Sequence, residues 1–167
     1  MTVKPLSNID IEKKLASHEI NIKFVPYHTL KFIKRIDDII PCILLYELHW
    51  PIGHWVTIFR NSQGLQYFDP TGEVPDALLE TNFEHPAGRV KMNADYTYLN
   101  GLLAQTGEPI IYNDKPLQTS KSNTCGYWCA VRLLFGDLTN DEFVNEWKKI
   151  KNGAERQRKI VRIYESI

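Results

Sequence analysis

Four side chains in this sequence have the types and the chain order needed for chemistry by a sulfur nucleophile. His54 and Asp69 come first, Gln118 follows, and Cys125 precedes an apolar run. A histidine can take the thiol proton and later return it to a leaving amine, while an acidic side chain orients the imidazole. A glutamine amide can donate a hydrogen bond to the oxygen that becomes negative during attack. The set predicts a cysteine hydrolase.

The position of Cys125 supports this prediction. Residues Thr124 to Phe135 are predicted to form a helix that begins at the cysteine, with Asn123 or Thr124 as its cap. Free backbone N–H groups and the positive end of the helix dipole stabilise a thiolate at such a place. We therefore expect Cys125 to be the nucleophile.

A hairpin is predicted to bring the base and the acid together. His54 to Arg60 and Leu65 to Asp69 are rich in strand-forming residues, and Asn61 to Gly64 between them has the composition of a turn. A tight turn folds the second strand back on the first. His54 and Asp69 are therefore expected side by side, although 15 residues separate them.

The rest of the chain alternates helical and extended patterns, which predicts an α+β fold. Ser7 is expected to cap a helix, Thr139 and Glu142 form a second capping signal, and Pro41 should lie near the start of a strand. Helices are predicted over 7–17, 93–105, from 139, and from 153 to about 165, and strands over 20–25, 39–48 and 108–112. No repeat or linker divides the chain, so residues 1–167 are predicted to form a single domain.

Composition narrows the class of protein. The chain has 167 residues with 43% apolar content, enough for a core, and no run approaches the roughly 18 apolar residues of a membrane span. We expect a protein that is not secreted and does not contact membranes. Three cysteines without a CxxC pair favour reduced thiols over a disulfide framework or zinc site, and Cys42 and Cys129 are interpreted as core residues. No metal or cofactor is expected.

Charge is uneven although the net charge is zero. Residues 148–167 hold seven Lys/Arg against two acids. Such a run is more often a solvated helix face than a phosphate-binding surface. A weak DNA contact through this segment is kept as a secondary hypothesis.

Several motifs together resemble the adenovirus-type and Ulp1-type cysteine proteases. The resemblance covers residues 53 to 135, and the spacing from Gln118 to Cys125-Gly126 is more like viral maturation proteases, including those of virophages and Maverick-type elements, than cellular SUMO proteases. It implies a central mixed, largely antiparallel sheet flanked by helices, with a papain-like site reached in a circularly permuted order of elements. It also implies a triad of His54, Asp69 and Cys125, with Gln118 as oxyanion donor. The motifs that carry it are Gly53-His54-Trp55, Phe68-Asp69-Pro70, Pro116-Leu117-Gln118 and Asn123 to Cys129.

The resemblance further implies a maturation endopeptidase. Such an enzyme cleaves capsid or core precursor proteins after glycine-containing motifs through a cysteine thioester, within the virion and the infected host cell, and we expect a monomer. Gly53, Trp55 and Gly126 are the expected substrate contacts, with Trp55 roofing a narrow groove or simply packing the hairpin. The adenovirus enzyme has Glu where this chain has Asp69. Its peptide activator and its requirement for DNA are not carried over.

Three other interpretations stay open. A Ulp1-like isopeptidase that removes a ubiquitin-like modifier would use the same triad. A catalytically inactive binding module would keep the fold alone, although all four chemical positions are filled. A thiol acyltransferase is the most remote. Small size and the absence of a substrate-docking extension favour the maturation protease.

Overall fold

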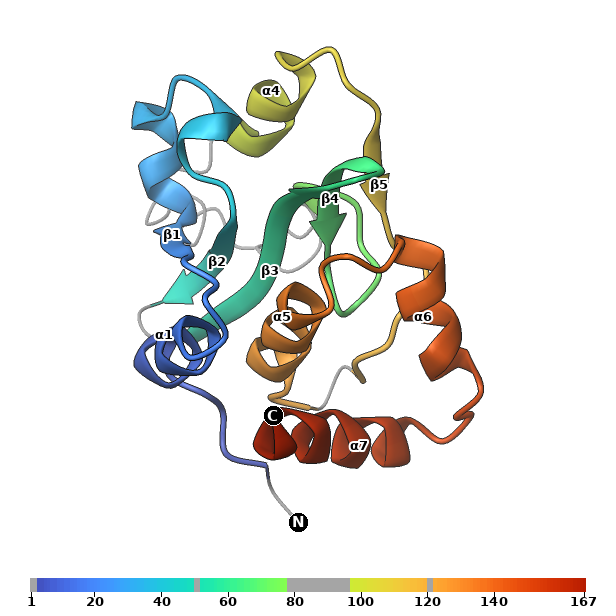
Figure 1. Ribbon diagram of the computed structural model, residues 1–167. Helices are drawn as coiled ribbons and strands as arrows, with labels where there is room; N and C mark the ends of the chain where they lie inside the picture. The colour runs from blue at the N-terminus through green and yellow to red at the C-terminus, as the bar shows by residue number, and fades with distance from the viewer. Residues whose placement is uncertain (1–2, 50–51, 78–96, 120–121) are drawn as a thin grey trace.

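Five strands form one mixed sheet in the computed structural model of the protein (Figure 1). The structure describes residues 3–49, 52–77, 97–119 and 122–167. The strand order follows the chain: the central pairs are antiparallel and the outer pairs, β1 with β2 and β4 with β5, are parallel. The predicted α+β fold with a mixed sheet is therefore confirmed. The strands are β1 (Lys23–Pro26), β2 (Cys42–His49), β3 (Ile52–Asn61), β4 (Gly64–Phe68) and β5 (Ile110–Tyr112).

Helices cover both faces of the sheet. Short 3-10 turns η1 (Tyr27–Phe32) and η2 (Ile36–Asp38) lie on one face with α4 (Tyr98–Ala104). The other face carries α1 (Asn8–Ala16), α5 (Cys125–Leu134), α6 (Asn140–Lys148) and α7 (Gly153–Ser166). None of the helices in the described residues combines the length and the apolar character needed to cross a bilayer.

Alternation along the strands divides the buried side chains into two cores. On β3, Val56 and Ile58 face the core shared with α4, whereas Phe59 packs with α5 and α6. Successive strand residues point to opposite faces, so a strand covered on both sides must be apolar throughout. β2 follows this rule, since Cys42 to Tyr46 are all buried. The prediction of a doubly covered strand is confirmed, and Pro41 directly precedes it as expected.

Local signals predicted the helix starts well. Ser7 and Asp10 form a reciprocal capping box at α1, and Thr139 and Glu142 form another at α6. The predicted helix over 93–105 is observed from Tyr98, and its first residues fall partly outside the described residues. These caps satisfy backbone N–H groups that a helix cannot pair internally, which is why the motif marks a start so reliably.

The β3–β4 hairpin forms as predicted, so the start of β3 and the end of β4 lie on the same side of the sheet, away from the turn. Thr57 pairs with Phe68 and Asn61 with Gly64, whose φ of 118° is easily reached only by glycine. In Figure 1 β3 and α5 both begin in the lower half of the view, and the arrow of β4 points downward toward them. Residues far apart in sequence are thereby gathered there.

Candidate active site

The imidazole of His54 and the carboxylate of Asp69 are hydrogen-bonded. Nε2 of His54 lies 2.7 Å from Oδ1 of Asp69, the Asp69 side chain has no exposed surface, and that of His54 is 18% exposed. Thr71 donates to the same Oδ1 from its backbone N–H at 2.8 Å and from its hydroxyl at 2.7 Å. The turn after β4 therefore holds the carboxylate in one orientation, and the carboxylate in turn holds the ring.

The remaining ring nitrogen of His54 is available to Cys125. Burial by itself lowers the pKa of His54, but hydrogen bonds to Asp69 and to the Cys125 thiol outweigh it and raise the pKa to about 10. The ring is therefore protonated at neutral pH, because an imidazolium gains from both partners.

The three cysteines occupy different environments. Cys125 is half-buried at the first residue of α5, whereas Cys42 and Cys129 are fully buried. Burial raises the pKa of Cys42 to about 12 and that of Cys129 well above its usual range. The prediction that these two are core residues is confirmed. Cys129 also donates to the carbonyl oxygen of Trp55 at 3.4 Å, which links α5 to β3 beside His54.

The helix α5 begins after Thr124, one of the two predicted cap residues, but within the described residues no side chain makes a capping hydrogen bond there. The cap residue is Thr124, but its hydroxyl donates to Oε1 of Gln157 instead of accepting from the first turn of the helix. The predicted cap position is therefore confirmed at Thr124, and only the side-chain hydrogen bond expected of a cap is not made. The physical reason is a competing buried acceptor on α7. Among the described residues, no side chain therefore caps the first N–H groups of α5, next to Cys125.

Gln118 is buried on the segment that faces the start of α5. Its backbone N–H and that of Leu117 both donate to the carbonyl oxygen of Pro70 at 2.8 Å, so the turn that orients Asp69 also holds this segment. The Gln118 amide donates to the carbonyl oxygen of Ser122 at 2.8 Å. An amide nitrogen carries two hydrogens, so one remains for another acceptor.

Two glycines expected at the substrate have packing reasons of their own. A Cβ on Gly53 would lie 2.3 Å from the carbonyl oxygen of Tyr46. A Cβ on Gly126 would meet the side chain of Ile11 at 3.2 Å, so this glycine permits close approach of α5 to α1. Their proposed contact with substrate stays a prediction.

Trp55 packs within the protein. Its half-buried indole contacts Phe24 edge to face, with ring centroids 5.6 Å apart. This corresponds to the packing interpretation of Trp55. A further role as the wall of a groove stays a prediction.

Sequence reasoning missed Asn113, which holds the backbone of Asp69. The Asn113 side chain is buried, accepts from the Asp69 N–H at 3.1 Å and donates to the Asp69 carbonyl oxygen. Its signal was an Asn directly after the predicted strand 108–112, in the same relation to that strand as Asp69 to its own. A polar side chain at a strand end is a natural binding position.

Parts of the basic segment are engaged inside the protein. Arg156 donates to the carbonyl oxygens of Leu117 and Ile150, and Lys159 lies over the ring of Trp147. These residues stabilise α7 against its neighbours. The DNA contact stays a secondary hypothesis, with fewer free cations than the sequence suggested.

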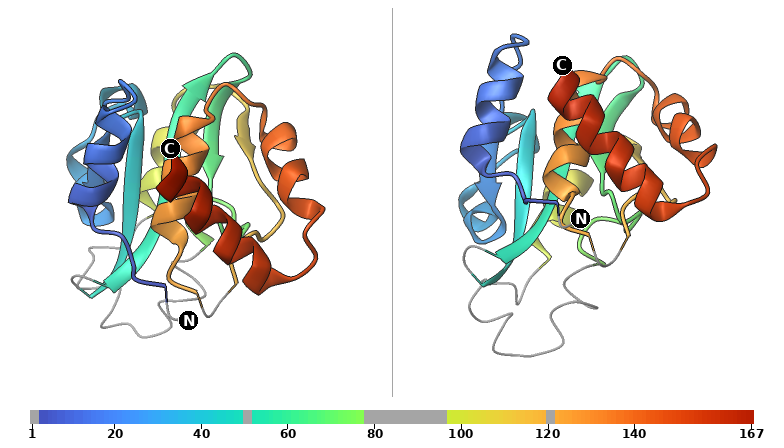
Figure 2. Two further views of the ribbon diagram at one scale, coloured as in Figure 1. Left: turned by 60° about the horizontal axis from the view of Figure 1, so that its bottom comes forward. Right: turned by 90° about the horizontal axis from the view of Figure 1, so that it is seen from below.

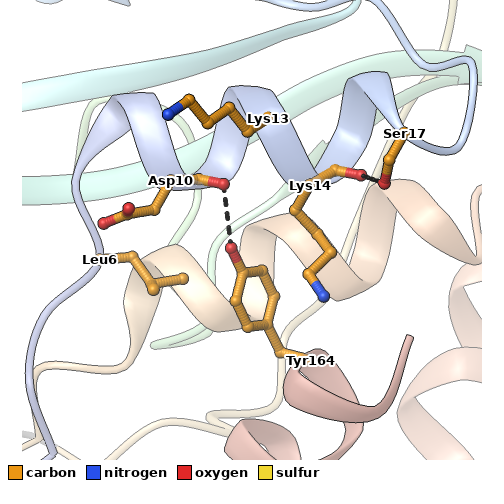
Figure 3. A pocket seen from close by; sticks show the side chains of 6 residues that line it. All are labelled: Leu6, Asp10, Lys13, Lys14, Ser17 and Tyr164. Atoms are coloured by element: carbon orange, nitrogen blue, oxygen red, sulfur yellow. Dashed lines mark hydrogen bonds between the residues drawn. The ribbon is translucent and has the colours of Figure 1, made fainter.

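A shallow hollow lies between α1 and α7 (Figure 3), and none of His54, Asp69 and Cys125 lines it. There the Tyr164 hydroxyl donates to the carbonyl oxygen of Asp10, and Lys14 donates to the backbone oxygen of Ile167. Its lining includes neither a cysteine nor a histidine. Its contacts tie the end of α7 to α1. It is lined by Leu6, Asp10, Lys13, Lys14, Ser17 and Tyr164.

Comparison with known proteins gives a viral relative. Over 145 residues the chain is 33% identical to the uncharacterized protein V9 of Sputnik virophage, an alignment that covers 83% of this chain and 80% of V9. The chain belongs to the V9 family. No model of a known protein family matches it. This relationship agrees with the predicted viral origin of the protein. The name of V9 states no activity.

Proposed function

We propose that the protein is a viral cysteine endopeptidase that processes capsid or core precursor proteins. One observation carries the proposal: the imidazole of His54 has both the carboxylate of Asp69 and the thiol of Cys125 as side-chain partners. Nucleophile, base and orienting acid within hydrogen-bond reach are the signature of covalent catalysis. Kinship with V9, a virophage protein, favours a viral role.

In the first step His54 takes the proton of the Cys125 thiol. The Cys125 sulfur attacks the carbonyl carbon of the scissile peptide bond, and the electron pair of the C=O bond moves to oxygen. The C–N bond then breaks as His54 gives its proton to the leaving amine, which leaves a thioester on Cys125. Neutral His54 next takes a proton from water, the resulting hydroxide attacks the thioester, and the carboxylic acid product leaves as the thiolate reforms. Asp69 holds the ring throughout.

The negative oxygen of both tetrahedral intermediates needs donors. The backbone N–H of Cys125 belongs to the uncapped start of α5, and the second hydrogen of the Gln118 side-chain amide comes from the facing segment. Donors fixed before the reaction act strongly because they need no reorganisation when charge develops. Gln118 is buried and held by Pro70 and Ser122, which makes it a rigid donor.

The substrate class follows from the resemblance to adenovirus-type proteases together with the virophage relative. Those enzymes cleave after glycine in structural precursors. Trp55 follows His54 directly and is half-buried, so part of the indole is available to a chain bound beside the base. A glycine-containing strand fits beside such a wall where a larger side chain would not.

The test is cleavage of virion structural precursors from the same virus, beside a Cys125→Ala variant. Wild type should release defined fragments with glycine before the cleaved bond, and the variant should release none. Iodoacetamide should label Cys125 and spare the two buried cysteines, which serve as internal controls. Equal fragment patterns from both proteins would refute the proposal.

Two other outcomes identify the alternatives. Cleavage of modifier-conjugated proteins with every structural precursor left intact would assign the isopeptidase activity. Failure of Cys125 to react with iodoacetamide, together with no cleavage of either substrate, would assign the inactive binding module.

A further inference from the structure

The side chain of Gln157, on α7, connects the two parts of the proposed oxyanion site. Figure 2 shows α7 lying across α5, and the Gln157 side chain is 6% exposed. Its Nε2 donates to the carbonyl oxygen of Leu117 at 2.9 Å, one residue before Gln118. Its Oε1 accepts from the Thr124 hydroxyl, one residue before Cys125.

The same amide also contacts Trp128 and Ser122, and Ser122 lies between Gln118 and Cys125 in the chain. Oε1 of Gln157 also accepts from the indole N–H of Trp128 at 3.0 Å and from the Ser122 hydroxyl at 3.4 Å. Ser122 is the residue whose carbonyl oxygen receives the amide of Gln118. One side chain therefore contacts the neighbours of both donors and the loop that joins them.

We infer that Gln157 is a positioning residue that sets the distance between the Gln118 amide and the start of α5, and so shapes the oxyanion site. The inference rests on the proposed function. It assigns to α7 a part in catalysis, although Gln157 touches no reacting atom. A shift of about 1 Å in a catalytic group can cost on the order of 100-fold in rate, so positioning of this kind is effective.

The chemistry of the contacts requires an amide. Gln157 donates on one side, to Leu117, and accepts on the other, from Thr124 and Trp128. A carboxylate accepts but does not donate, and a methionine of similar length does neither. Water cannot easily replace the lost bonds at a buried position, so either change leaves polar groups unpaired.

Arg156 shares part of this contact. Its Nε donates to the carbonyl oxygen of Leu117 at 3.2 Å, so Gln157 is not alone on that side. Within the described residues no hydrogen bond of Arg156 reaches Thr124, whereas Gln157 bonds both Leu117 and Thr124. The position of the Leu117 segment relative to Cys125 therefore depends on Gln157.

The inference predicts a specific kinetic pattern. No hydrogen bond joins Gln157 to His54 or Asp69 within the described residues, so the thiolate and imidazolium should stay intact in its variants. Gln157→Met should lower kcat by about 10- to 100-fold and change KM by less than about 3-fold, because the oxyanion forms only in the transition state. The rate of iodoacetamide labelling at Cys125 should stay within about 3-fold of wild type, since alkylation forms no oxyanion.

The experiment measures kcat and KM with fluorogenic peptide amides that carry Gly-Gly before the scissile bond. The rate at which iodoacetamide labels Cys125 is measured separately on the same proteins. Gln157→Met is made in the wild-type and Gln118→Ala backgrounds, with Arg158→Met as control, because Arg158 is the next residue of α7 and is exposed. Urea unfolding checks that each variant is folded. Gln157→Glu, which keeps the acceptor and loses the donor, replaces Gln157→Met if the latter does not fold.

The decisive result is the double variant. If Gln157 acts by positioning Gln118, Gln157→Met should cost less than about 3-fold once Gln118 is already Ala. An equal loss in both backgrounds, an unchanged kcat, or a matching loss of iodoacetamide labelling would overturn the inference. The proposed function fails in a different way: wild type would then be as inactive as Cys125→Ala on all substrates. An active wild type therefore separates a failure of the inference from a failure of the proposed function.

Discussion

Two buried aspartates, seven residues apart in sequence, have different partners and different roles. Asp69 meets His54, which contacts the Cys125 thiol at one end of the sheet. Asp76 accepts from the Tyr46 hydroxyl at 3.1 Å and from the backbone N–H of Asn100 at 2.9 Å, in the first turn of α4. Both side chains are almost completely buried. Burial of a carboxylate does not by itself indicate catalysis, since the partners decide what it does.

The surroundings of Asp76 are built for stability. Burial raises the pKa of Asp76, while hydrogen bonds from Asn100, Tyr27 and Tyr46 oppose that change. Burial also raises the pKa of Tyr46 and of Tyr67 well above the usual range, so these phenols stay neutral donors. Asp76 serves as an anchor between the segment after β4 and α4. Its hydrogen bonds within the described residues involve no cysteine or histidine.

Asp69→Asn should give the largest effect and tests the catalytic side of the comparison. An asparagine amide facing Nε2 of His54 favours the wrong tautomer and gives no support to an imidazolium. We expect kcat on glycine-containing peptides to fall on the order of 10³- to 10⁴-fold, with some turnover left. Steady-state kinetics measures this, and an unchanged kcat would remove Asp69 from the triad.

Gln118→Ala should follow in size. Loss of one oxyanion donor typically costs roughly 100- to 1000-fold in kcat, and KM should change far less because the ground state does not use the donor. The same peptides serve as substrate, and iodoacetamide labelling of Cys125 is the control that should be preserved. Equal kcat values for variant and wild type would reject the oxyanion role.

The site could be predicted from sequence wherever local chemistry decides the geometry. A short turn at Asn61–Gly64 determines the pairing of β3 with β4, so His54 and Asp69 followed from spacing alone. Capping boxes fixed the starts of α1 and α6 in the same way.

Long-range contacts could not be predicted in this way. Gln157 lies at a position of α7 that otherwise carries core residues, with Ile160 and Tyr164 on the same buried face. A polar residue at such a position is a signal, but its partners outside α7 lie 29 to 40 residues away in sequence. The uncapped start of α5 had the same origin, because the Thr124 hydroxyl binds Gln157. These features depend on how α7 packs, which no local pattern encodes.

Asp76→Asn tests the structural side of the comparison. The exchange keeps residue shape and tolerates the observed φ of 64°, but it sets an amide against hydroxyl and N–H donors that need acceptors. We expect the free energy of unfolding to fall by about 1–3 kcal/mol. Urea unfolding measures the loss. The kcat of the folded protein should stay within about 3-fold of wild type, and a loss as large as that of Asp69→Asn would break the comparison.

The pH dependence of the unfolding free energy should also distinguish the two aspartates, and this is the smallest of the expected effects. The pKa of His54 is raised from 6.5 to about 10 in the folded protein, so folding favours its protonated form. This contribution to stability is complete below pH 6.5 and is lost as pH rises through about 10. Because Asp69 is one of the groups that raise this pKa, Asp69→Asn should flatten the fall in unfolding free energy across that window.

Asp76→Asn is the matched control, since no hydrogen bond joins Asp76 to His54 within the described residues. The difference in unfolding free energy between wild type and Asp76→Asn should therefore stay constant from pH 6.5 to about 10, while the difference for Asp69→Asn should shrink. Urea titrations at intervals across the window measure both. Parallel curves for all three proteins would mean that the carboxylate of Asp69 does not support the imidazolium of His54, and the two aspartates would then have the same kind of role.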